Sequence, residues 1–325
     1  MVAFLIRRLL QSLLALGVMS LLVFAGVYAI GNPVDILISP QADQAEIARV
    51  TAALGLDQPL WVQYWSFMRG AFTGDLGRSF THNVPAITLI MQRMPATLEL
   101  ALCAIGISIA LGIPLGVLAG LKAETATGRA IMAGSILGFS LPTFWIGLML
   151  IMVFAVWLGW LPSTGRGATV TVLGLQLSLF TLDGLRHLLL PAFTLSLGYV
   201  ALIVRLAYSG TREALLQDYV KFARAKGLAD RRVVGVHVLK NILIPIVTVL
   251  GLELGSVIAF SVVTETIFAW PGMGKLIIDS INVLDRPVIV AYLMIIVFLF
   301  VLINLAVDLL YSVIDPRVRV TGEAA

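Results

Sequence analysis

Six long apolar stretches, separated by shorter polar ones, run along this chain of 325 residues. Five of them are intervals without a charged residue: 26 residues between Arg8 and Asp35, 22 between Glu99 and Lys122, 36 between Arg129 and Arg166, 18 between Arg186 and Arg205, and 21 between Arg286 and Asp308. The sixth, about residues 243–263, is interrupted only by Glu253. About 20 helical residues cross the hydrocarbon core of a bilayer. The pattern therefore predicts an all-α polytopic membrane protein with six transmembrane helices.

The composition agrees with a membrane protein and narrows its chemistry. Hydrophobic residues make up 59% of the chain, charged residues 12%, and the mean hydropathy is +1.00. Cys103 is the only cysteine and lies in a predicted span, which excludes a disulfide within the chain. His82, His187 and His237 are far apart in the sequence and form no metal-ligand pattern. We therefore expect no metal site and no cofactor in this chain.

The distribution of Lys and Arg predicts the orientation in the membrane. With the N-terminus inside, the inner segments carry 13 of these residues in 69 positions and the outer segments carry 8 in 116. Cytoplasmic loops of membrane proteins carry the Lys and Arg excess. We therefore expect cytoplasmic N- and C-termini. The same bias accounts for the net charge of +4 without a nucleic-acid partner.

Residues 208–243 form a basic segment between two predicted spans, with seven Lys or Arg residues. Apolar positions recur at helical spacing and continue from Leu215 through Tyr219 on one face. Gly227 can take the left-handed conformation that ends a helix, and Asp230 can cap a second one. The pattern predicts a helix, a glycine stop and another helix, a surface suited to docking a partner protein.

Two further segments are predicted outside the membrane core. In residues 31–97, Trp61, Trp65 and Phe72 recur at helical spacing, which is typical of an amphipathic helix at the bilayer surface. Packing on the first span and contact with another protein outside the membrane both remain open for this helix. Residues 167–182 alternate in places between polar and apolar positions, which favours a short β-like or interfacial element.

Small and charged residues within the spans suggest how the helices interact. Gly112, Gly116 and Gly120 recur every four residues and allow another helix to approach closely. Glu253 is costly near the middle of a bilayer, so it should face protein or a water-filled path. It could line a translocation path or form a structural hydrogen bond, with Arg205 or a residue of another subunit as its partner.

The external segment 264–289 contains the sequence GMGK, which resembles part of a phosphate-binding loop. The spacing does not match, because Ala269 stands at the first glycine position and Leu276 follows Lys275. We therefore expect that this chain does not hydrolyse ATP through a P-loop and is not an enzyme.

Three separate sequence motifs resemble those of one protein family. DYVKFARAKGL followed by HVLKNILIPIVTVLG is similar to the cytoplasmic coupling loop of permease subunits in ABC importers, in the dipeptide, oligopeptide and nickel branch. GLDQPLWVQYWSF with GDLGRS, and TETIFAWPGMGKLIIDSINVLDRPVI, resemble external segments of the same branch. The chain departs from the family's coupling pattern at Lys221, where that pattern has a glutamate, so no role of a carboxylate is carried over there.

The resemblance implies the type I ABC importer permease fold with a small extracytoplasmic insertion after the first helix. The implied divisions are a transmembrane helix at 1–30, the insertion at 31–97, a core transmembrane domain at 98–312 with a coupling loop at 208–243 and an external gate segment at 264–289, and a cytoplasmic tail at 313–325. The implied ATPase-coupling residues are Glu213, Asp218, Ala223, Arg224, Ala225, Lys226 and Gly227. The residues expected at the path or gate are Glu253, Glu265, Phe268, Pro271 and Gly272.

The resemblance further implies half of a translocation path for di- or oligopeptides in the bacterial cytoplasmic membrane. Expected partners are a second, homologous permease subunit, two ABC ATPases that bind ATP and magnesium, an extracytoplasmic substrate-binding protein, and membrane lipid. Nickel chelates, glutathione or opines are alternative substrates within the same branch. A different class, an ion-coupled secondary transporter with Glu253 as its coupling carboxylate, also remains open.

Overall fold

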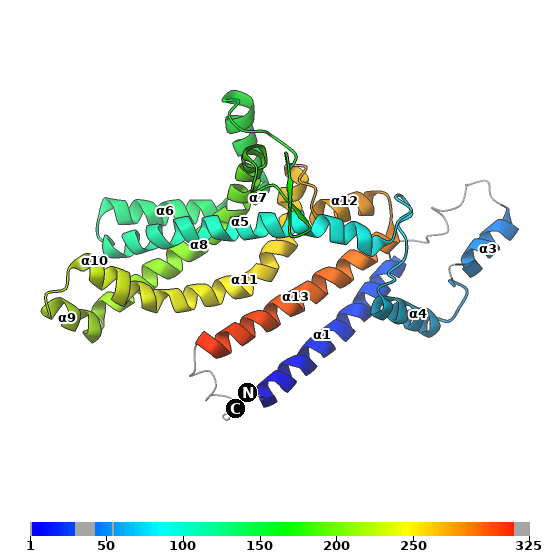
Figure 1. The fold of residues 1–325 in the computed structure, drawn as a ribbon, viewed down its shortest axis with the longest axis horizontal. Coiled ribbons are helices and arrows are strands. Elements are labelled where there is room, and N and C mark those ends of the chain that lie inside the picture. The colour runs from blue at the N-terminus through cyan, green and yellow to red at the C-terminus, as the bar shows by residue number, and fades with distance from the viewer. Residues whose placement is uncertain (1, 30–42, 54, 315–325) are drawn as a thin grey trace. The chain divides into compact units, whose positions relative to one another are not determined.

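The computed structural model describes residues 2–29, 43–53 and 55–314 of a mostly helical chain (Figure 1). The chain divides into two compact units. One comprises residues 1–94 together with 272–325, and the other comprises residues 95–271. The division falls inside a long helix, α5 (Ala86–Leu121), and directly before the helix α12 (Met273–Asn282).

The first unit is built around two long helices, α1 (Val2–Ala29) and α13 (Arg286–Ile314), which run side by side (Figure 1). The shorter helices are α3 (Gln44–Ala53), α4 (Leu60–Thr73) and α12, and α12 packs on α13. The predicted amphipathic helix is present as α4. Its Tyr64 ring lies 5.3 Å from the Phe24 ring of α1, while Trp61 and Phe72 are exposed. One face of α4 thus packs on α1, and the opposite face is exposed.

The second unit is a helical bundle with a small hairpin. Its helices after α5 are α6 (Ala126–Ser140), α7 (Thr143–Leu150), η1 (Ile151–Trp157), α8 (Leu182–Leu216), α9 (Asp218–Ala225), α10 (Asp230–Arg232), η2 (Val233–Val238) and α11 (Leu239–Ile267). Here η1 and η2 are π-helical segments. The strands β1 (Val170–Val172) and β2 (Leu175–Leu177) pair antiparallel, with Thr171 opposite Gln176. The predicted β-like element is therefore a hairpin.

The glycines of α5 pack closely against α8. The sequence predicted such a close approach of another helix. A Cβ atom built on Gly112 would lie 2.7 Å from Cβ of Ile203, and one built on Gly116 would lie 2.5 Å from Cβ of Ala207. Such distances are shorter than any van der Waals contact between carbon atoms. The two helix backbones therefore approach closely only because these positions lack side chains.

Four helices of the described chain are long and apolar enough to cross a membrane, namely residues 86–121, 182–216, 230–267 and 286–307. A fifth candidate is the pair α6 and α7–η1, which is bent by 103°. The bend falls at Leu141 and Pro142, both in extended conformation, because the residue before a proline avoids the helical region. The interval between Arg129 and Arg166 thus contains a bent pair of helices and not one straight helix.

Candidate functional site

The basic segment 208–243 folds into the compact helical connection between α8 and α11 (Figure 1). It contains the end of α8, then α9, α10 and η2. Gly227 has φ +76°, the left-handed conformation expected of a residue that ends a helix. Its amide donates to the carbonyl of Arg224 at 2.9 Å, and the amide of Leu228 donates to the carbonyl of Ala223 at 3.3 Å. The predicted helix, glycine stop and second helix are confirmed.

Two local details differ from the sequence prediction. The helical face does not continue from Leu215 to Tyr219, because Gln217 is extended, with ψ 148°, and separates α8 from α9. Asp230 does not cap the second helix either. It is the first residue of α10, and Ala229 occupies the N-cap position. Asp230 instead lies 3.6 Å from the guanidinium of Arg224, so it still connects the two short helices.

The inner face of this segment packs into a small apolar core. Val220 and Ala223 of α9 are buried together with Val233 and Val238 of η2. Ala223, expected among the residues that contact an ATPase, is 4% exposed and faces this core. Its small side chain therefore holds α9 close to η2 and is not available for direct contact.

The outer face carries the other residues expected to contact an ATPase. Exposed are Glu213, Asp218, Arg224, Ala225, Lys226 and Gly227. Phe222 is 60% exposed, and the ammonium of Lys226 lies 4.5 Å from the centre of its ring. Lys221 Nζ donates to Asp218 at 2.9 Å, which lowers the pKa of that carboxyl below its usual value. The result is an exposed surface with a central aromatic ring and charges of both signs.

A side-chain bridge fixes α9 to the start of α11. Nδ2 of Asn241 donates to the hydroxyl of Tyr219 at 3.0 Å and to the carbonyl of His237 at 2.7 Å. Sequence periodicity could not reveal this contact because α10 and η2 lie between the two bridged helices. The hydrogen bond between Asn241 and Tyr219 therefore connects α9 directly to α11.

Among the residues predicted at the external gate, Glu265 lies in the last turn of α11 and the others follow that helix. Most of them are buried. Glu265 is fully buried, accepts a hydrogen bond from Thr97 at 2.7 Å, and lies 3.0 Å from the hydroxyl of Ser261. Phe268 is 1% exposed, and its carbonyl accepts from the amide of Gly165 at 2.8 Å. Trp270 is also buried. In this conformation Glu265 and Phe268 hold the turn in place and do not face water.

The last two predicted gate residues close this turn. Pro271 is half-buried and Gly272 is buried. Gly272 has φ −93° and ψ −175°, an extended conformation at the start of α12. The sharp bend instead comes from Ala269, whose φ of +46° is left-handed. The indole nitrogen of the following Trp270 donates to the carbonyl of Ala96 at 2.9 Å.

A charged network that the sequence reading missed stands beside this turn. Arg166 pairs with Glu99 of α5 at 2.6 Å, and the Glu99 side chain is 2% exposed. Glu99 also accepts from the backbone amides of Ser178 and Leu179, each at 2.7 Å. The guanidinium of Arg166 lies 5.6 Å from the ring centre of Trp270. In the sequence both charged residues served only to mark the ends of apolar intervals.

Glu253 lies halfway along α11 and lines a cavity of about 630 Å³ between α6, α7, α8 and α11. Arg205 of α8, the expected partner, lines the same cavity. Among the described side chains, however, no salt bridge joins the two. The guanidinium of Arg205 instead lies 4.8 Å from the ring centre of Phe139.

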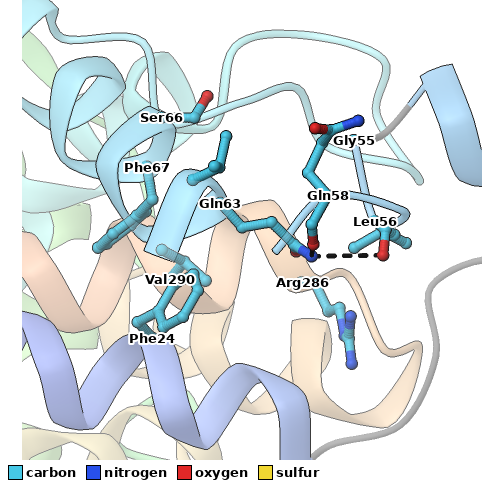
Figure 2. A pocket seen from close by; sticks show the side chains of 10 residues that line it. Phe24, Gly55, Leu56, Gln58, Gln63, Ser66, Phe67, Arg286 and Val290 are labelled. Atoms are coloured by element: carbon cyan, nitrogen blue, oxygen red, sulfur yellow. Dashed lines mark hydrogen bonds between the residues drawn. The ribbon is translucent and has the colours of Figure 1, made fainter. Parts of the chain in front are cut away.

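A second cavity, of about 350 Å³, lies in the other unit, between α1, α4 and α13 (Figure 2). Phe24, Phe67 and Val290 form its apolar wall. At its rim, Nε2 of Gln63 donates to the carbonyl of Leu56 at 3.3 Å (Figure 2). Within the described residues, no cluster of three His, Cys, Asp or Glu side chains could hold a metal ion.

The fold and its sites define a multi-pass helical membrane protein, and comparison with known proteins identifies its family. The family model described as "Binding-protein-dependent transport system inner membrane component" matches residues 112–320, and the corresponding N-terminal model matches residues 1–101. The chain belongs to this family of ABC transporter permeases, which are non-enzymatic subunits of the bacterial inner membrane. The family resemblance inferred from the three sequence motifs is confirmed.

Individual relatives match along nearly the whole chain. It is 38% identical to the dipeptide transport system permease protein DppB of Escherichia coli K12, over 98% of this chain and 99% of that protein. It is 40% identical to the di/tripeptide transport system permease protein DppB of Pseudomonas aeruginosa UCBPP-PA14, with the same coverage. An inward-facing structure of the MetNI methionine ABC transporter matches with a TM-score of 0.53 and 18% identity, over 70% of this chain and 96% of that chain. This last match supports the permease fold.

Proposed function

We propose that this chain is one of two permease subunits in an ATP-driven importer of di- and oligopeptides. The named functions of the relatives, at 38–40% identity over nearly the full length, support peptides as the substrate class. A second, homologous permease subunit completes the translocation path. An extracytoplasmic binding protein delivers the peptide, and two ABC ATPases bind ATP and magnesium.

The proposed membrane arrangement has six spans with both termini in the cytoplasm. α1, the bent pair α6 and α7–η1, and the four long helices supply these spans. Residues 31–97 then form the extracytoplasmic insertion and residues 313–325 the cytoplasmic tail. Residues 31–42, 54 and 315–325 of these segments lie outside the described part of the chain. The Lys and Arg bias supports this orientation. In this proposed arrangement the exposed face of residues 208–243 lies in the cytoplasm and the segment 264–289 lies outside.

The exposed surface of residues 208–243 is the observation that carries the proposal. Phe222 projects from a short helix fixed by Gly227 and by the Asn241 bridge, beside exposed charges of both signs. An exposed aromatic ring surrounded by charged groups is typical of a protein contact. We propose that each ATPase of the pair engages one permease subunit through this surface, and that α9 passes its movement to α11.

Reconstitution tests the energy source directly. Proteoliposomes with the complete transporter and its binding protein should accumulate labelled peptide with ATP, and uptake should be lost when the P-loop lysines of the ATPases are replaced. An ionophore should leave ATP-driven uptake intact. Accumulation driven by an ion gradient through this chain alone, without ATPases, would instead establish the ion-coupled class, and loss of that accumulation in Glu253→Gln would identify Glu253 as its carboxylate.

A further inference from the structure

The cavity beside Glu253 has the size and lining of a small-ligand site. Its volume of about 630 Å³ falls within the range of roughly 300–1,000 Å³ usual for such sites. Much of its wall is aromatic, and three of these rings are more than half exposed: Phe139 at 59%, Phe144 at 51% and Phe260 at 70%. A mainly apolar wall with a few polar groups binds variable side chains while the polar groups orient the ligand.

Two opposite charges stand on different helices of this wall. Glu253 is 14 residues from each end of α11, about 21 Å along the axis, which is deep within a membrane-spanning helix. Arg205 lies on α8, with its guanidinium against the Phe139 ring. Ionisable side chains at such depth are costly and occur where they face a polar path or a ligand. Among the described residues neither makes a salt bridge to the other, so the two charges do not neutralise each other and can each meet an opposite charge on a ligand.

We propose that this cavity is a transit site for short peptides in zwitterionic form. The carboxylate of Glu253 receives the terminal ammonium, and the guanidinium of Arg205 receives the terminal carboxylate, which its planar donors fit in pairs. The aromatic wall contacts the peptide side chains. Every short peptide has both termini whatever its sequence, so this arrangement selects a chemical class and leaves the side chains free to vary. The inference rests on the proposed import of peptides.

Equilibrium binding to the purified transporter tests the assignment without the binding protein. The complex is isolated through a tag on this chain, placed in nanodiscs and dialysed against labelled Ala-Phe, N-acetyl-Ala-Phe or Ala-Phe amide. We expect the wild-type complex to bind Ala-Phe about tenfold more tightly than either blocked form, the change expected from losing one charge-assisted hydrogen bond.

The two termini are assigned by two variants. Glu253→Gln should bind Ala-Phe and N-acetyl-Ala-Phe equally, while it still prefers Ala-Phe over the amide. Arg205→Gln should show the opposite pattern. Glu124→Gln is the matched control, since this exposed carboxylate lies outside the cavity, and its binding should equal that of the wild type.

Several results would overturn the transit site. They are no binding by the wild-type complex, equal binding of all three peptides, or a uniform loss for all three in both variants, which would mark a structural role. ATP-driven uptake is measured on the same preparations. Normal ATP-driven uptake with no preference for free termini would reject the transit site alone, whereas uptake independent of ATPases would reject the proposed function itself.

Discussion

Arg166 donates two hydrogen bonds to Oε2 of Glu99, from Nε at 3.1 Å and from Nη2 at 2.6 Å. The other oxygen of Glu99 accepts the amides of Ser178 and Leu179. One buried carboxylate thus connects α5 to the loop before β1 and to the residues that precede α8. This carboxylate helps to position the hairpin, together with the hydrogen bonds that join Ala168 to Asp183 and Thr181.

Removing Arg166 should therefore destabilise the second unit. Arg166→Ala leaves the Glu99 carboxylate buried without its counter-charge, and breaking a buried ion pair in this way costs about 3–5 kcal/mol. We expect a clearly lower midpoint of thermal unfolding in detergent. The midpoint of Arg166→Lys should lie between those of the wild type and Arg166→Ala, because lysine keeps the charge but cannot place two donors as the guanidinium does. Glu124→Gln removes an exposed pair with Arg212 at 3.8 Å and serves as the control. An unchanged midpoint for Arg166→Ala would contradict the role of this network.

The contact between α5 and α8 predicts that Gly116 tolerates no side chain. Gly116→Ala would place Cβ 2.5 Å from Cβ of Ala207 and 2.6 Å from the carbonyl oxygen of Val204. Forcing the helices apart should destabilise the protein by about 1–3 kcal/mol. Gly106→Ala lies on the same helix with no atom within 4 Å, so it controls for helix propensity. Equal unfolding midpoints for the two variants would show that the contact adjusts without cost.

These features differ in how far the sequence could predict them. The ridge at Gly112, Gly116 and Gly120 and the helix stop at Gly227 were predictable, since spacing and the lack of a side chain are local properties. The break at Gln217 was not, because no glycine or proline marks it and the apolar period continues across it. The pairing of Glu99 with Arg166 joins residues 67 positions apart, and only the fold brings them together.

Substitutions at Gly227, which has a left-handed conformation, test the proposed ATPase contact. Gly227→Val forces a branched side chain into a conformation that costs L-residues about 1–2 kcal/mol, so α9 should end incorrectly. Gly227→Asn is the control, because asparagine adopts this conformation readily. We expect the valine variant to insert in the membrane but to retain much less ATPase on affinity purification, and the asparagine variant to retain most of it. Full retention by both would argue against docking at this turn.

The buried carboxylate of Glu265 should tolerate an amide better than an alkyl group. Glu265→Gln keeps an acceptor for the hydroxyl of Thr97, which donates at 2.7 Å. Glu265→Leu removes it, and a buried polar group left unsatisfied costs about 1–3 kcal/mol. We expect the order wild type, glutamine, leucine in unfolding midpoint and in peptide uptake. Identical uptake by all three would show that Glu265 has no part in holding the turn after α11.

Cysteine labelling tests the proposed orientation, because Cys103 is the only native cysteine and can be replaced first. In a Cys103→Ala background, Leu173→Cys places a thiol at the hairpin tip, where residue 173 is 99% exposed. Lys226→Cys places one on the exposed surface of residues 208–243. With both termini in the cytoplasm, a membrane-impermeant maleimide should label position 173 in intact spheroplasts, and position 226 only after permeabilisation. The reverse pattern would invert the topology and place the basic segment, with its proposed ATPase contact, on the wrong side of the membrane.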